Sequence, residues 1–189
     1  MKEVDAILEF DTQRLKEILS KGLAGANQEF EGQSLLVWAC SVGNEEAAVF
    51  LLDNGADYDV HGQRNETPLM LASYSGMDRF TSKLLSHAVK LDTVDSLGRD
   101  ALMFAAKGGH ASIVRMLCAA GALPSRTDAA GRSSLQWALV EDDHAEVVES
   151  LIECCPGAIN SSIKDAALHY AKELGRHQSE KVIAASLIG

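Results

Sequence analysis

Apolar and small residues recur along the chain at a fixed interval of 33 residues. A leucine column runs through Leu36, Leu69, Leu102, Leu135 and Leu168. An alanine column keeps the same interval through Ala6, Ala39, Ala72, Ala105, Ala138 and Ala171. A sustained period of this length is typical of a stack of small structural repeats. The pattern therefore predicts a repeat architecture.

The pattern within one interval predicts two helices. Thr67 and Pro68 suit the start of a helix, because a threonine hydroxyl accepts from free backbone amides and proline fits the first turn. Gly76 interrupts this segment, and residues 79–85 then repeat apolar side chains at helical spacing. In the next interval Gly121 suits a left-handed helix cap. Each unit is therefore expected to be a helix, a tight turn and a second helix.

These features resemble the ankyrin repeats, a family whose unit is 33 residues long and carries a TPLHxA signature. Residues 67–72 read TPLMLA, residues 168–171 read LHYA, and residues 55–57 read GAD, the segment that precedes the family's hairpin. The D-x-x-G of that hairpin occurs at 95–98 and 128–131. The resemblance implies an all-α repeat solenoid, an ankyrin-repeat stack of about six helix-turn-helix units joined by β-hairpin-like loops.

The period divides the chain into units at about 1–28, 29–61, 62–94, 95–127, 128–160 and 161–189. The first and last units are atypical, as expected of caps that face water on one side. We predict a single domain over 1–189, with no separate catalytic domain and no linker.

Three segments depart from the repeat pattern. Asn65 replaces a hairpin glycine, and residues 86–89 replace the usual cap glycine of the third unit. The fifth unit has EDDH at 141–144 where the fourth has GGH at 108–110, and it ends in the irregular segment 154–157. We expect the first two segments to be strained or reshaped and the fifth unit to contain a distorted loop.

The charge balance limits the classes of partner. The chain of 189 residues has 17 Lys and Arg against 27 Asp and Glu, a formal net charge of −10. This balance disfavours general nucleic-acid binding, which depends on cations that displace phosphate counterions. No run approaches the ~20 apolar residues that span a bilayer, and the start lacks the apolar region of a signal peptide. We expect a monomer in the cytoplasm, or alternatively the nucleus, that binds neither nucleic acid nor membrane.

The sequence shows no arrangement typical of an enzyme site. The six histidines are scattered, and neither a phosphate-binding glycine loop nor a zinc-type spacing of Cys and His occurs. The cysteines Cys40, Cys118, Cys154 and Cys155 are expected to be reduced thiols. The adjacent pair at 154–155 leaves a redox switch, or a cysteine-based enzyme using His144, as an alternative. We predict no catalytic residue, no cofactor and no metal.

Two further sets of residues are expected to be structural. Aromatic side chains precede the alanine column at Trp38, Phe104, Trp137 and Tyr170, and we predict that they fill the core between adjacent units. His110 and His169 occupy positions where the resemblance implies bonds to neighbouring backbone that hold the hairpins in place.

The resemblance places partner binding on hairpin tips and first helices, the concave face of such a stack. Mapped by phase, the candidate residues are Phe30, Gln33, Arg64, Glu66, Tyr74, Leu97, Arg99, Lys107, Arg132 and Glu141. The four cations of this set form a predicted basic stripe. Arginine matches carboxylates and phosphates, so the stripe favours an acidic or phosphorylated segment as ligand, with Phe30, Tyr74 and Leu97 as apolar anchors. The alternative is that these arginines pair with nearby Asp and Glu of the same chain.

The favoured function is a non-catalytic protein–protein interaction module, such as an adaptor, scaffold or targeting subunit, that binds another protein or a peptide segment. The alternative is a structural subunit of a larger assembly, held through the convex face or through a cap.

Overall fold

The computed structural model describes residues 2–22, 25–154 and 157–188. Within these residues the regular structure consists of twelve helices and one two-stranded sheet. The chain forms two compact units, of which the first ends at Val89 and the second begins at Lys90. The single domain expected over 1–189 stays a prediction.

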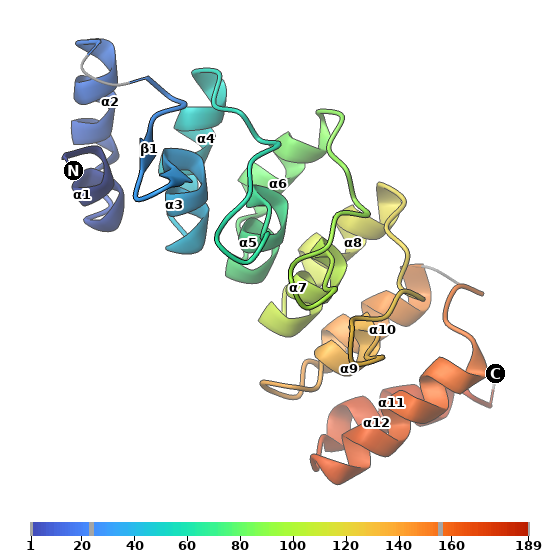
Figure 1. Ribbon diagram of the computed structural model, residues 1–189. Coiled ribbons are helices and arrows are strands. Elements are labelled where there is room, and N and C mark those ends of the chain that lie inside the picture. The colour runs from blue at the N-terminus through green and yellow to red at the C-terminus, as the bar shows by residue number, and fades with distance from the viewer. Residues whose placement is uncertain (1, 23–24, 155–156, 189) are drawn as a thin grey trace. The chain divides into compact units, whose positions relative to one another are not determined.

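The described part of the first unit contains three helix pairs. Its helices are α1 (Lys2–Leu8), α2 (Thr12–Ser20), α3 (Leu35–Ser41), α4 (Glu45–Asp53), α5 (Pro68–Ser75) and α6 (Asp78–Leu85). Helices α1, α3 and α5 pack in an inner row, and α2, α4 and α6 pack in an outer row beside it (Figure 1). Strands β1 (Glu29–Phe30) and β2 (Gln33–Ser34) form an antiparallel hairpin before α3.

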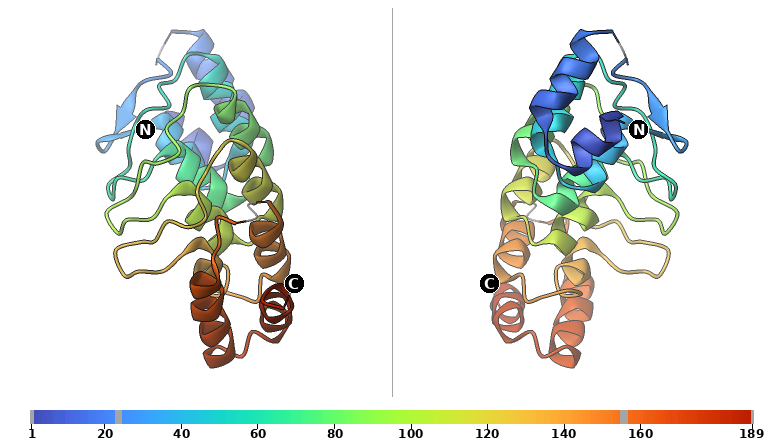
Figure 2. Two further views of the ribbon diagram at one scale, coloured as in Figure 1. Left: turned by 90° about the vertical axis from the view of Figure 1, so that its right-hand side faces the viewer. Right: turned by 90° about the vertical axis from the view of Figure 1, so that its left-hand side faces the viewer.

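The second unit repeats the two rows. Its helices are α7 (Ala101–Gly108), α8 (Ala111–Ala119), α9 (Ser134–Trp137), α10 (Ala145–Cys154), α11 (Ser161–Glu173) and α12 (His177–Ser186). The inner row is α7, α9 and α11, and the outer row is α8, α10 and α12. In each unit the hairpin loops extend away from the helices (Figure 2). The predicted helix-turn-helix units with hairpin-like loops are confirmed.

The predicted helix signals occupy the expected positions. The Thr67 hydroxyl accepts a hydrogen bond from the Met70 N–H at 3.2 Å, and Pro68 is the first residue of α5. Gly76 ends that helix in the left-handed region with a φ of 73°, and Gly121 follows α8 with a φ of 99°. A side chain with a Cβ is strained in this conformation, so glycine marks the turns.

The alanine column forms the tightest part of the core. All six alanines are fully buried, and the leucine column is buried from Leu36 to Leu135. Where inner helices of one unit pack side by side, a larger side chain than alanine forces the backbones apart. The period of 33 residues therefore reflects the packing of one helix pair on the next.

The departures from the pattern have different outcomes. Asn65 takes over the role of the hairpin glycine with a φ of 64°, a conformation that asparagine tolerates better than most residues. Helix α6 of the third repeat ends at Leu85, and Ser86 lies in the right-handed region. This helix therefore has no left-handed cap at Ser86. The chain accommodates both changes in the loop backbone.

The distorted loop expected in the fifth repeat, at residues 128–160, is confirmed. Helix α9 has four residues, whereas α7 has eight, and residues 138–144 form a loop in place of its second half. His144 lies against the preceding helix pair of the same compact unit, because a Cβ on Gly109 would be only 2.6 Å from the His144 Cε1 atom. The irregular end of this repeat includes Cys155 and Pro156, which lie outside the described residues.

No helix in the part of the chain that the structure describes combines the length and the apolar composition that crossing a membrane requires.

Candidate partner-binding surface

One aspartate closes the hairpin at 95–99. The Asp95 Oδ1 atom accepts hydrogen bonds from the backbone N–H groups of Leu97 at 2.9 Å and Arg99 at 2.8 Å. Its Oδ2 atom accepts from Arg99 Nε at 2.8 Å and Nη2 at 2.6 Å. The Arg99 side chain is only 8% exposed and that of Asp95 is fully buried. Asp95 therefore fixes both the loop and the arginine, while Leu97 remains 47% exposed at the tip.

The hairpin at 128–132 repeats this arrangement. The Asp128 Oδ1 atom accepts from the N–H groups of Ala130 at 2.9 Å and Arg132 at 2.8 Å, and Oδ2 accepts from Arg132 Nε at 3.0 Å and Trp137 Nε1 at 3.1 Å. Burial by itself raises the pKa of Asp128, but the hydrogen bonds from Arg132 and Ala130 outweigh burial and lower this pKa overall. The carboxylate is thus held as an anion.

The Trp137 indole joins the two hairpins. Its ring centre lies 4.1 Å from the Arg132 guanidinium carbon, 5.3 Å from that of Arg99 and 5.9 Å from Lys107 Nζ. The Arg99 guanidinium also lies 4.5 Å from the Phe104 ring centre. Such cation–π contacts stabilise most when water is excluded. Phe104 and Trp137 are buried as predicted, and they also support the hairpin arginines.

The same two hairpins touch through their backbones. The Leu97 carbonyl accepts a hydrogen bond from the Ala129 N–H at 2.9 Å. Gly98 has a φ of 77°, and a Cβ at this position would lie 2.8 Å from the Ala129 nitrogen. Glycine is therefore required by both the backbone conformation and the close approach. The two tips form one fixed surface with Leu97 exposed on it.

The hairpin at 62–66 in the first unit also pairs a carboxylate with an arginine, but the carboxylate comes from the last residue of the loop instead of the first. Gly62 stands where the later hairpins have Asp, and Glu66 stands where they have Arg. The Glu66 carboxylate accepts from the Arg64 N–H at 2.9 Å and from Arg64 Nε at 2.8 Å. A Cβ on Gly62 would lie 3.1 Å from Glu66 Oε2. Glu66 therefore supplies from the end of the loop the carboxylate that Asp supplies from its start.

The other predicted residues of the first unit lie on the hairpin of β1 and β2 and on α5. The Phe30 and Trp38 ring centres are 6.2 Å apart, and Trp38 Nε1 donates a hydrogen bond to the Phe30 carbonyl at 3.1 Å. Gln33 pairs with Phe30 in the hairpin. Tyr74 is partly exposed on α5.

The ten predicted binding residues divide equally between the units. Phe30, Gln33, Arg64, Glu66 and Tyr74 belong to the first, and Leu97, Arg99, Lys107, Arg132 and Glu141 belong to the second. All four cations of the predicted basic stripe pair with carboxylates of the chain: Arg64–Glu66, Arg99–Asp95, Lys107–Glu141 and Arg132–Asp128. This pairing is the alternative considered from the sequence. The sequence contains a pattern that indicates this pairing for two of the arginines, because D-x-x-x-R occurs at 95–99 and again at 128–132.

Carboxylates of one helix pair also cap the outer helix of the next pair, which the sequence did not reveal. Asp143 accepts hydrogen bonds from the N–H groups of Gln178 at 2.9 Å and Ser179 at 3.0 Å, and from the Ser179 hydroxyl, at the start of α12. Glu45 accepts from the Phe80 N–H at 3.0 Å at the start of α6. Burial raises the pKa of Asp143, but these hydrogen bonds outweigh it and lower the pKa overall. Such caps join residues far apart in sequence and carry no local pattern.

Replacing Asp143 by asparagine is expected to remove an acid-sensitive part of the stability. A carboxyl whose pKa is lowered by folding contributes fully above its unfolded pKa of about 3.9, and this contribution disappears as the pH falls through the lower folded pKa. The wild-type chain should exceed Asp143→Asn by about 1–3 kcal/mol in free energy of unfolding at pH 7, and the gap should close toward pH 2. Urea unfolding over this pH range, with exposed Asp142→Asn as control, measures the gap. A gap of constant size contradicts the capping role.

The remaining candidates from the sequence are a metal site and the cysteines. Among the described residues, no three His, Cys, Asp or Glu side chains are placed to hold a metal ion. Cys40 is buried, and burial strongly raises the pKa of its thiol. Cys154 is exposed at the end of α10, and its neighbour Cys155 lies outside the described residues.

The expectation for His169 is wrong. Its side chain is 77% exposed, and its Nε2 atom lies 3.3 Å from Glu173 Oε1 on the same helix. Helix α11 is the last inner helix among the described residues.

Stacked helix pairs with protruding hairpins define a repeat protein whose rigid loops are available for contacts. The family model described as ankyrin repeats (3 copies) matches residues 5–95, 36–128 and 69–165 in overlapping segments. The chain therefore belongs to the ankyrin-repeat family, as the sequence predicted. Ankyrin repeats generally mediate protein–protein interactions, and the family is typically non-enzymatic.

Known proteins resemble the chain over the repeats. An ankyrin repeat domain from Acinetobacter baumannii AYE gives a TM-score of 0.76 at 27% identity, covering 97% of this chain and 96% of that chain. The transient receptor potential cation channel subfamily A member 1 homolog of Caenorhabditis elegans is 32% identical over 122 residues, which are 65% of this chain and 10% of that protein. Mouse ankyrin repeat domain-containing protein 63 is 31% identical over 127 residues, which are 64% of this chain and 32% of that protein. The chain thus matches only a minor part of these two relatives.

Proposed function

We propose that the chain is a non-catalytic interaction module that binds a partner protein through the hairpin surface of its second unit. The hairpin surface is formed by Leu97, Ala129, Ala130 and Arg132. One observation carries the proposal: the buried carboxylates of Asp95 and Asp128 hold both hairpins through Arg99 and Arg132, while Leu97 stays exposed at a tip. A preformed surface loses little conformational entropy on binding, and an exposed apolar side chain can act as an anchor. Binding without catalysis fits an adaptor, scaffold or targeting subunit.

We further propose that the bound segment is acidic or phosphorylated and contacts Arg132. An arginine has five N–H donors, and Arg132 directs Nε and Nη2 toward Asp128. The side chain is 32% exposed, so the donors on Nη1 suit a carboxylate or phosphate of the partner. Arg99 is nearly buried and serves as a positioning residue for Leu97, not as a ligand contact.

The hairpin surface is tested with the full chain as bait. Partners are captured from cell extract and quantified by mass spectrometry for the wild-type chain, Leu97→Asp, Arg132→Gln and the control Leu123→Asp. Leu123 is 57% exposed in the same unit but lies outside the hairpin surface. We expect Leu97→Asp to lose one or more specific partners that Leu123→Asp retains, and Arg132→Gln to weaken the same partners at least about tenfold, the equivalent of 1.4 kcal/mol.

Circular dichroism and urea unfolding first establish that all variants are folded. Retention of every partner by both Leu97→Asp and Arg132→Gln overturns the hairpin surface as the binding site. Loss with Leu97→Asp but not with Arg132→Gln keeps the surface and overturns the acidic ligand.

A further inference from the structure

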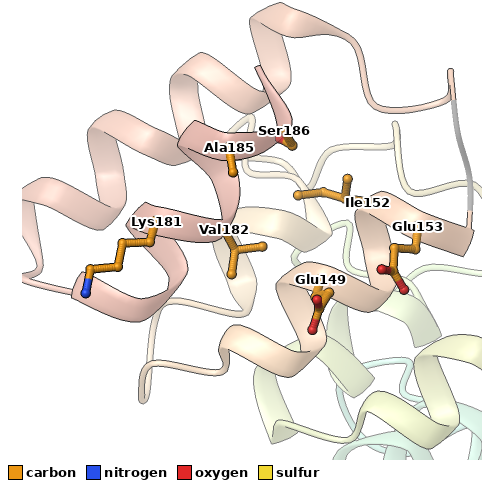
Figure 3. A pocket seen from close by; sticks show the side chains of 7 residues that line it. All are labelled: Glu149, Ile152, Glu153, Lys181, Val182, Ala185 and Ser186. Carbon is orange, nitrogen blue, oxygen red and sulfur yellow. The ribbon is translucent and has the colours of Figure 1, made fainter. Parts of the chain in front are cut away.

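A pocket opens between the last two outer helices of the second unit. It has a volume of about 400 Å³ and lies between α10 and α12. Ile152, Val182 and Ala185 form its apolar part, and Glu149 and Glu153 line the α10 side (Figure 3). Because the two carboxylates are four residues apart on one helix, they lie on the same face.

Cations bridge the other neighbouring outer helices within each unit. In the described residues the bridges between α2 and α4, between α4 and α6, and between α8 and α10 are Lys16–Glu46, Lys83–Asp53 and Arg115–Glu146. The Arg115 Nη1 atom also donates a hydrogen bond to the Ser150 hydroxyl at 2.8 Å. A long basic side chain therefore spans each of these three junctions and pairs with a carboxylate across it.

The junction of α10 and α12 breaks this rule. Glu149 follows buried Val148 on α10 as Arg115 follows buried Val114 on α8, so a carboxylate occupies the place of the bridging arginine. Lys181 is the cation at the pocket, but its amino group points away from both carboxylates (Figure 3). No hydrogen bond or ion pair joins it to Glu149 or Glu153 among the described residues. The junction therefore combines an open apolar floor with two unmatched negative charges.

We propose that this groove binds a basic amphipathic segment of a partner protein. An apolar side chain of the segment occupies the pocket over Ile152 and Val182. Lys or Arg side chains one helical turn apart on the segment pair with Glu149 and Glu153, in the manner of Arg115 at the preceding junction. The net charge of −10 attracts such a segment from a distance and disfavours a second copy of this chain. The groove is independent of the hairpin surface, because it lies between outer helices.

The proposal is tested with three synthetic helical peptides that share one apolar face and carry Lys, Gln or Glu at the flanking positions. The full chain is labelled at its methyl groups, and binding is followed by NMR. We expect the Lys peptide to shift the methyl signals of Ile152, Val182 and Ala185 and to bind at least about tenfold more tightly than the Gln peptide at low salt. Glu149→Lys/Glu153→Lys should reverse the preference toward the Glu peptide.

A control with the same charge change is Asp165→Lys/Glu173→Lys on the exposed face of α11, which should keep the preference for the Lys peptide. Equal binding of the Lys and Gln peptides, shifts confined to other parts of the chain, or no shifts at millimolar peptide each overturn the proposal. Shifts of the same methyl groups that depend on the concentration of the chain alone assign the groove to a second copy and also overturn it. The measured signals come from methyl groups in the groove, so the result does not depend on whether the hairpin surface binds a partner.

Discussion

Replacing Arg99 by methionine is expected to lower the free energy of unfolding by about 3–5 kcal/mol, the range for removing one partner of a buried ion pair. Methionine retains much of the length of the arginine side chain, so the loss reports the charge and its hydrogen bonds rather than a large cavity. The Asp95 carboxylate then stays buried without its guanidinium partner. The Phe104 and Trp137 rings also lose the cation that lies against both.

Urea unfolding of the wild-type chain and Arg99→Met measures this effect. Arg79→Met is the control, because Arg79 is exposed on α6 and a surface change of this kind stays within about 0.5 kcal/mol. A loss below about 1 kcal/mol for Arg99→Met would mean that the hairpin does not depend on the buried pair. The expected result also bears on function, since a change at Arg99 that abolishes partner binding acts through the position of Leu97.

The second large effect is expected at the exchanged hairpin of the first unit. Glu66→Arg should lower the free energy of unfolding by about 2–4 kcal/mol, because the Arg64 N–H loses its acceptor and a cation replaces a buried carboxylate. The double variant Gly62→Asp/Glu66→Arg should recover most of this loss. It recreates the Asp and Arg of the hairpins at 95–99 and 128–132.

The recovery is expected because the three hairpins share one backbone. The first residue donates its N–H to the carbonyl of the fifth at 2.7 Å for Gly62 and at 2.9 Å for both Asp95 and Asp128. Gly62 lies outside the left-handed region, so its backbone accepts an aspartate. A double-mutant cycle that includes Gly62→Asp, followed by urea unfolding, gives the coupling energy. Additive losses from the two single changes contradict the exchange of roles.

Most of the fold was predictable because it depends on local and periodic signals. Thr67, Pro68 and Gly76 set the bounds of α5 through capping and backbone conformation, and the alanine column marks where helix pairs pack. The departures of residues 141–144 and 154–157 from the pattern indicated a distorted loop in the fifth repeat, but they did not indicate that α9 has only four residues. The contact of His144 with Gly109 was not foreseen, since nothing in the local sequence states which side chain fills that space.

The candidate site was predicted less completely than the fold. Phase located the hairpins, and Leu97 is exposed at a hairpin tip, but its role as an anchor stays a prediction. The sequence alone left open whether the arginines face a ligand or the chain, because a guanidinium pairs equally well with an internal or an external carboxylate. The structure pairs each arginine with Asp95 or Asp128 of its own hairpin, and it leaves the Arg132 side chain 32% exposed, so a contact of Arg132 with a ligand stays a proposal.

The sequence by itself determined the repeat class, the helix pairs and the position of each hairpin, because period, caps and turn residues act over a few residues at a time. Only the tertiary structure decided which charged side chains pair with other groups of the same chain. It buries Arg99, lets Asp143 cap a helix 35 residues away and leaves Glu149 and Glu153 beside an open groove. Apart from the Asp95–Arg99 pair, which lies within one hairpin, these outcomes depend on distances between side chains of different repeats, which one period of sequence does not contain.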